Sequence, residues 1–196
     1  MTDDNSGSIA DSGEALSDTE NRMALSAKID ALVNSALDTL YENDKHLIFN
    51  EPTSEKTNIE TGVGHHVGER AIVFRFAHYL QCLLSKDETL STYDLDCEYN
   101  RNGASAKSLK SFPNGTYPDV ILHKRGSNEG NLLVIEFKTY WNRNPKNDQK
   151  KIDEFTDSSG KYRFLCGYTI CIERSREKCK IDKYPKTIVK TSMKGR

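Results

Sequence analysis

The residues of this sequence best suited to joint chemistry are Asp119, Glu136 and Lys138. Asp119 opens the apolar run at residues 119–122, and Glu136 and Lys138 end the apolar run at residues 133–138. Side chains alternate between the two faces of a strand, so Glu136 and Lys138 share one face. If the two runs pair as a hairpin, Asp119 and Glu136 meet at one end of the sheet.

Such a set of side chains suits chemistry at a phosphate group. Two converging carboxylates favour a hard divalent cation, with Mg²⁺ as the default and Mn²⁺ as its substitute. A lysine beside them can orient or activate a water and stabilise the negative charge of a pentavalent phosphorus. The first prediction is therefore that Asp119 and Glu136 lie close enough to share one ion.

The elements before this pair are predicted from apolar spacing. Apolar residues recur every three or four positions between Ser26 and Glu42, which predicts a helix. A short strand is expected over His46–Phe49, followed by a polar loop. A second, more apolar helix is predicted from Val67 to Leu84, with Glu69 in its first turn, where the helix dipole favours a carboxylate.

Three strands, a helix and a further strand are predicted next. The strands are residues 93–99, 119–124 and 132–138, and the turn-forming residues 125–130 make the last two a hairpin. A helix at residues 148–155 and a buried strand at residues 164–172 complete the pattern.

Four phrases of the sequence resemble the PD-(D/E)xK nuclease superfamily, and in particular an uncharacterised prokaryotic family within it. The core motif is Pro118-Asp119, a spacer, and then Glu136-Phe137-Lys138 after an apolar strand. The resemblance spans about residues 67–172, and its phrases lie at residues 68–71, 96–101, 118–126 and 131–138.

The resemblance implies a fold of the α/β (α+β) class. It is a restriction-endonuclease-like core, in which a central mixed sheet is flanked by helices in the order αβββαβ. The elements predicted from the residues follow the same order.

The resemblance also implies residue roles. Asp119 and Glu136 correspond to metal ligands, and Lys138 to the catalytic lysine. Glu69 corresponds to a further carboxylate of the catalytic and metal site. Asp148 and Lys151 match a polar pair that is sometimes placed near it.

Two functions remain open. The first is a Mg²⁺- or Mn²⁺-dependent nuclease that hydrolyses phosphodiester bonds of nucleic acid, with DNA favoured over RNA and endo- or exonuclease action undecided. The second is a catalytically inactive module of the same fold that binds nucleic acid or a protein partner. The oligomeric state is also open, and a homodimer is compatible with the sequence.

Charge divides the chain into three parts. Residues 1–24 are expected to be a disordered acidic tail, and residues 25–173 the nuclease-like domain with an additional N-terminal helix. Residues 174–196 hold nine basic and two acidic side chains, although the net charge of the chain is only −1. This basic segment either adds phosphate contacts or is a solvated terminus.

The remaining composition points to a cytoplasmic protein. The five cysteines are odd in number and include no CxxC pair, which favours reduced thiols. No apolar run approaches the ~20 residues of a membrane span, so no membrane association is expected.

Overall fold

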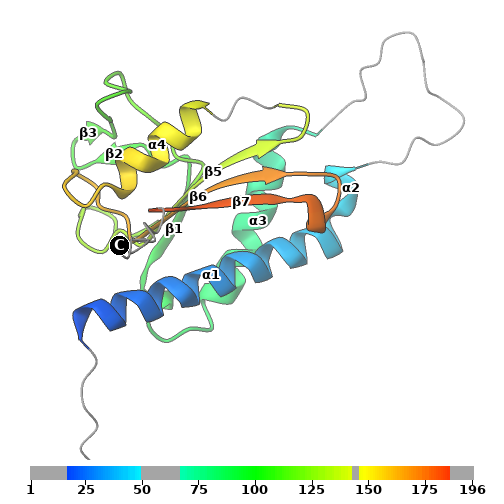
Figure 1. Ribbon diagram of the computed structural model, residues 1–196, viewed down its shortest axis with the longest axis horizontal. Helices are drawn as coiled ribbons and strands as arrows, with labels where there is room; N and C mark the ends of the chain where they lie inside the picture. Colours follow the sequence, from blue (N-terminus) through cyan, green and yellow to red (C-terminus); the bar gives the residue numbers. More distant parts are fainter. Residues whose placement is uncertain (1–16, 50–66, 143–145, 186–196) are drawn as a thin grey trace, which may run out of the picture.

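The computed structural model describes residues 17–49, 67–142 and 146–185 (Figure 1). The helices are α1 (Asp18–Asn43), α2 (Lys45–Ile48), α3 (Glu69–Leu84) and α4 (Lys146–Thr156), with 3₁₀ turns at Leu90–Thr92 and Arg176–Lys178. The strands are β1 (Asp94–Cys97), β2 (Arg101–Asn102), β3 (Ser105–Ala106), β4 (Val120–His123), β5 (Leu133–Thr139), β6 (Cys166–Ile172) and β7 (Lys180–Tyr184). Within these residues, no helix combines the length and apolar character needed to cross a membrane.

A five-stranded mixed sheet forms the centre of the molecule, in the order β1-β4-β5-β6-β7. Neighbouring strands are antiparallel except β5 and β6, which run parallel and are joined through α4. β2 and β3 form a separate two-stranded hairpin. The expectation of a central mixed sheet flanked by helices is confirmed.

The two faces of the sheet carry different side chains. One face is apolar, with residues such as Ile135, Phe137 and Ile170 packed in a core with α1 and α3. On the other face, Ile121 and Val134 pack in a smaller apolar cluster that includes Ile152 and Phe155 of α4. Side chains alternate along β5, so Glu136 and Lys138, which flank Phe137, lie on the opposite face of the sheet from Phe137 and face α4.

Helix α1 begins eight residues earlier than the predicted Ser26. The Glu20 N–H donates to Ser17 Oγ and the Ser17 N–H donates to the Glu20 carboxylate, a capping box that fixes the start of the helix. Asp18 and Glu20 also place negative charge at the positive end of the helix dipole. Residues 18–24 are therefore helical, and residues 1–16 of the expected acidic tail lie outside the described residues.

The strand expected over His46–Phe49 is wrong, because Lys45–Ile48 form one helical turn. Backbone bonds from Leu47 to Asp44 and from Phe49 to Lys45 close this turn. Four residues directly after a long helix are too few for their sequence to distinguish a strand from a helical turn. A helical turn also allows Ile48 to be buried.

The basic C-terminal segment contains a strand that was not predicted. β7 pairs antiparallel with β6, so the strand at Phe164–Ile172 is not the last of the sheet. Two of the basic side chains are used within the fold, since Arg176 pairs with Asp38 and Lys183 with Asp30. Residues 186–196 lie outside the described residues.

Candidate active site

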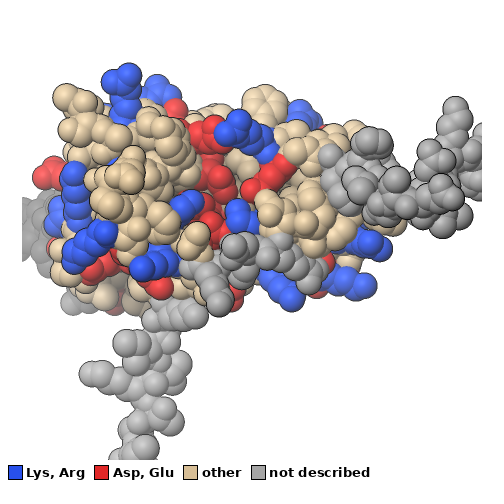
Figure 2. Space-filling model, turned by 90° about the horizontal axis from the view of Figure 1, so that it is seen from above, with Lys and Arg blue, Asp and Glu red and all other residues tan. Residues whose placement is uncertain are grey.

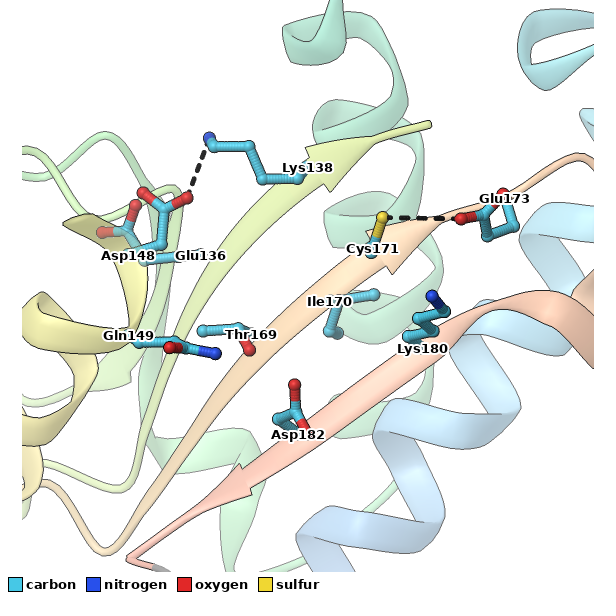
Figure 3. A pocket seen from close by; sticks show the side chains of 10 residues that line it. All are labelled: Glu136, Lys138, Asp148, Gln149, Thr169, Ile170, Cys171, Glu173, Lys180 and Asp182. Carbon is cyan, nitrogen blue, oxygen red and sulfur yellow. Dashed lines mark hydrogen bonds and ion pairs between the residues drawn. The ribbon is translucent and has the colours of Figure 1, made fainter. Parts of the chain in front are cut away.

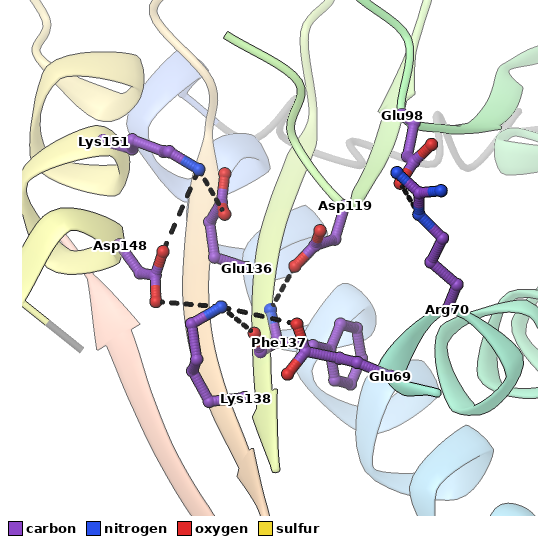
Figure 4. Close-up of polar contacts among 9 residues, drawn as sticks. All are labelled: Glu69, Arg70, Glu98, Asp119, Glu136, Phe137, Lys138, Asp148 and Lys151. Carbon is purple, nitrogen blue, oxygen red and sulfur yellow. Dashed lines mark hydrogen bonds and ion pairs between the residues drawn. The ribbon is translucent and has the colours of Figure 1, made fainter. Parts of the chain in front are cut away.

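Asp119 lies one residue before β4, and Glu136 lies within β5. The antiparallel register pairs Val120 with Ile135, so continuing it by one residue would set Asp119 opposite Glu136. Opposed residues of an antiparallel pair point to the same face, with Cβ atoms about 4.5–5.5 Å apart. The Phe137 N–H donates to Asp119 Oδ2 at 2.6 Å and fixes this carboxylate against β5 (Figure 4).

Both carboxyl groups lie in a buried environment, which disfavours their ionised form. Glu136 is only 2% exposed. Burial, together with the neighbouring Asp119 charge, raises the pKa of Glu136 to about 8 although Lys151 opposes the shift. Burial likewise raises the pKa of Asp119 to about 6, against the backbone hydrogen bond from Phe137. A nearby positive charge would therefore stabilise the ionised form of both carboxyl groups.

Lys138 lies between two further carboxylates. Its Nζ is 3.3 Å from Asp148 Oδ2 of α4 and 3.4 Å from Glu69 Oε1 of α3, and it donates to the Phe137 carbonyl at 2.8 Å. Burial alone would lower the pKa of Lys138, but Asp148 and Glu69 outweigh it and the pKa is raised. Lys138 is therefore an ammonium ion at neutral pH.

Helix α4 supplies a second lysine. Lys151 Nζ donates to Glu136 Oε2 at 2.9 Å and lies 3.9 Å from Asp148 Oδ1. The approach of this helix depends on Gly167 of β6, because a Cβ there would meet Ile152 Cγ2 at 2.5 Å and Thr156 Cγ2 at 2.7 Å. The missing side chain of Gly167 thus lets α4 bring Asp148 and Lys151 over Glu136.

The structure therefore brings together all four residues predicted for the site, and adds the expected polar pair. Glu69 enters from the first turn of α3, while Asp119, Glu136 and Lys138 come from the sheet (Figure 4). Asp148 and Lys151, which sequence reasoning placed only near the site, contact Lys138 and Glu136 directly.

Oxygen atoms suited to a cation are present but are not gathered around one point. Glu136 Oε1 and Glu69 Oε2 are buried and have no hydrogen-bond partner within the described part of the chain. Hard carboxylate oxygens of this kind are the ligands that Mg²⁺ and Mn²⁺ take. No group of three or more His, Cys, Asp or Glu residues within the described ranges is arranged to hold a metal ion. Lys151 pairs with Glu136, and Lys138 pairs with Glu69.

A cavity of about 190 Å³ adjoins Lys138 (Figure 3). Glu136, Lys138 and Asp148 line it on one side, and Lys180 and Asp182 of β7 line it on the other. The β7 side was missed in the sequence, because this strand is only five residues long and three of them, Lys180, Asp182 and Lys183, are charged.

A second hollow lies on the other side of Asp119, where Arg70 and Glu98 form an ion pair of 2.7 Å. Phe74 of α3 lines this hollow with 64% of its surface exposed. Both residues lie within phrases of the nuclease-like resemblance, at residues 68–71 and 96–101, but neither was singled out in the sequence as a site residue.

Comparison of the chain with protein-family models, with curated proteins and with solved structures found no match.

Proposed function

We propose that the chain is a metal-dependent nuclease with a restriction-endonuclease-like core. The observation that carries the proposal is that Asp119 is bound to β5 beside Glu136, through the Phe137 N–H, with the Lys138 ammonium on the same face of the sheet as Glu136. The order α3-β1-β4-β5-α4-β6 supports it, because it follows the αβββαβ pattern implied by the sequence motif.

The donor set fits a divalent cation of the Mg²⁺ class. Two buried carboxyl groups with raised pKa values and the unsatisfied oxygens of Glu136 and Glu69 are relieved by a positive charge. Asp119, Glu136 and Glu69 are the residues that would hold the ion. Part of the proposal is that the ion replaces the Lys151 ammonium as the partner of Glu136.

Each residue of the site has a distinct part in the proposed hydrolysis. A bound Mg²⁺ would supply Lewis acidity at the phosphate and activate water. In the hydrolysis, a water forms one P–O bond as the P–O bond to the leaving alcohol breaks, and the proton that the water loses balances the proton that the leaving oxygen takes up. The Lys138 ammonium donates to a phosphate oxygen and stabilises the added negative charge. Asp148 and Glu69 keep Lys138 in place.

The charge of the surrounding surface is compatible with this assignment. On the face seen from above, acidic side chains gather in a central band, with Lys and Arg side chains around it (Figure 2). Such an acidic centre repels a phosphate backbone unless a cation neutralises it, whereas basic side chains around it attract the same backbone.

Cleavage assays on variants test the proposal. Full-length protein is incubated with single- and double-stranded DNA and RNA plus Mn²⁺ or Mg²⁺, and in a chelator. Cleavage is expected only with the metal. Glu136→Gln and Asp119→Asn are expected to lower it by at least about 100-fold, since loss even of outer-shell partners of a metal costs about 10–100-fold.

The matched control is Asp153→Asn, which removes an exposed carboxylate from α4 outside the site and is expected to leave cleavage unchanged. Undiminished cleavage by either site variant would refute the role of that residue.

One observation favours the inactive alternative. Lysine ammonium groups, rather than a preformed metal pocket, neutralise the carboxylates in this arrangement. A module that only binds nucleic acid would show binding without metal-dependent cleavage of any substrate, and Mn²⁺ would leave its thermal stability unchanged.

A further inference from the structure

A separate polar pocket of about 240 Å³ lies beside the β2–β3 hairpin and the turn that follows β4. Its lining includes Arg101, Asn102, Lys107, His123 and Asn128. Two of these side chains are cations, and none of the described lining residues carries a carboxylate. The cavity beside the candidate active site differs, since Glu136, Asp148 and Asp182 line it.

Lys107 is the unusual member of this pocket, because it is only 2% exposed. Lysine is almost never buried without a counter-charge. Here Nζ donates to the Arg101 carbonyl at 2.6 Å and lies 4.6 Å from the ring centre of Tyr99 and 5.8 Å from that of Tyr162. No carboxylate of the described residues lies within ion-pair distance of it.

The nearest acidic group does not supply the missing charge. Asp96 is engaged by the Arg125 guanidinium and by His123 Nε2 at 3.0 Å. Its charge is therefore already balanced. Burial lowers the pKa of Lys107 to about 8, in keeping with a cation that lacks a full partner.

We propose that this pocket binds an oxyanion of the phosphate class, with the Lys107 ammonium as its buried counter-charge. An ammonium carries three N–H donors, and only one of those of Lys107 is used in a hydrogen bond, to the Arg101 carbonyl, so others remain for an anion. Asn128 Nδ2 donates to Asn102 Oδ1 at 2.9 Å, which leaves the Asn102 amide nitrogen as a further donor. Arg101 is exposed and adds positive charge at the mouth.

The site stands apart from the proposed nuclease centre but on the same face of the sheet. His123 and Asp119 are four residues apart along β4 and its start, so they share a face at a separation of about 13 Å. The phosphate class has two sources, a phosphate of a nucleic acid or a small free phosphate. Binding at Lys107 does not depend on cleavage at Glu136.

Titration with inorganic phosphate tests the pocket directly. Calorimetry on the full chain in chelator, at constant ionic strength set with chloride, is expected to show one site. Lys107→Met is expected to weaken binding by about tenfold or more, because a hydrogen bond to a charged group is lost. The matched control Lys110→Met removes an exposed lysine three residues away and is expected to bind phosphate like the original chain.

Thermal stability separates a binding role from a structural one. Without phosphate, Lys107→Met is expected to melt at the same or a higher temperature, since it removes a buried cation without a full partner. If Lys107 only braces the loop, the variant melts lower and its phosphate affinity stays unchanged, which overturns the proposal. Absence of phosphate binding by the original chain overturns it too.

A second variant guards against misfolding. Arg101→Ala changes an exposed side chain and is expected to weaken phosphate binding severalfold with the melting temperature retained. Unchanged phosphate affinity of this variant counts against the site.

Competition experiments then identify the source of the anion. Displacement of a 5′-phosphorylated, but not a 5′-hydroxyl, oligonucleotide by phosphate assigns the pocket to a terminal phosphate of nucleic acid, and displacement of neither assigns it to a small free phosphate.

Discussion

At the scale of single residues, the candidate site keeps negative charge in a buried place. The pKa of Glu136, raised to about 8 by burial and by Asp119, means that the native state binds the proton of this group more tightly than the unfolded chain. Stability from this group is therefore greatest below about pH 4.5 and declines as pH rises toward 8. Glutamine at this position has no such dependence.

We accordingly predict that Glu136→Gln stabilises the metal-free protein, although it removes the group required for cleavage. The gain over the original chain should grow between pH 5 and pH 8 and reach on the order of 2 kcal/mol, since part of the benefit is offset by the unpaired Lys151. Urea denaturation in chelator at both pH values measures it, with Asp153→Asn as the control. A variant less stable than the original chain at pH 8 would contradict this account.

A second residue-scale prediction concerns Asp96, which joins β1 to β4. Burial alone would raise the pKa of Asp96, but hydrogen bonds from Arg125 and His123 outweigh it and the pKa is lowered. A lowered pKa contributes stability above the unfolded value near 4, and this is lost as pH falls through the native value. Asp96→Asn should thus cost about 1.5–3 kcal/mol at pH 7 and progressively less below pH 4.

Denaturant titrations at pH 7 and pH 3 check the change. Asp94→Asn serves as the comparison, because Asp94 is more exposed and lies 3.8 Å from the Arg125 guanidinium. Equal losses for the two variants would show that the His123 contact adds nothing.

At the scale of elements, the position of α4 determines the contacts of Asp148 and Lys151 with Lys138 and Glu136. Gly167→Val would drive side-chain atoms into Ile152 and Thr156, so the helix has to shift. Overpacking of this kind costs about 1–3 kcal/mol, and the shift should separate Lys151 from Glu136. Thermal melts and the cleavage assay should both register the loss.

Gly68→Ala is the matched control for that variant. Nothing lies within 4 Å of a Cβ built at Gly68, so only a small stability change is expected. A Gly167→Val variant with unaltered melting temperature and cleavage would rule out the proposed control of the site by helix approach.

The sequence predicted some elements of the fold and missed others. The strands around residues 119–124, 132–138 and 164–172 were predicted correctly, because they are apolar enough to be buried on at least one face. The contacts of Lys151 with Glu136 were not predicted, because they depend on the approach of α4 to β6. β7 was missed because three of its five residues are charged.

At the scale of the whole molecule, the basic C-terminal segment continues in the sequence beyond β7. Residues 186–196 contribute four basic and no acidic side chains, and they follow β7. If they contact DNA phosphates, truncation after Pro185 should flatten the dependence of log affinity on log salt by up to about 3.6, or ~0.9 per phosphate.

Fluorescence anisotropy over a salt series, in chelator, measures that slope. The comparison is a chain with the four basic residues changed to glutamine, which should match the truncation. Equal slopes for the full and shortened chains would assign no DNA contact to these residues. Truncation after Glu173 is unsuitable, because it removes β7 from the sheet.

The pairing of β7 also has a consequence for how the chain folds. Lys183 contacts Asp30, and Arg176 contacts Asp38 and Asn34, at sequence separations of 138 to 153 residues. Contacts between segments so distant slow folding, because a long loop must close before they form. During synthesis, helix α1 leaves the ribosome long before Arg176 and Lys183 are made. The polar side chains Asp30, Asn34 and Asp38 of α1 therefore stay without these partners until nearly the whole chain has been synthesised.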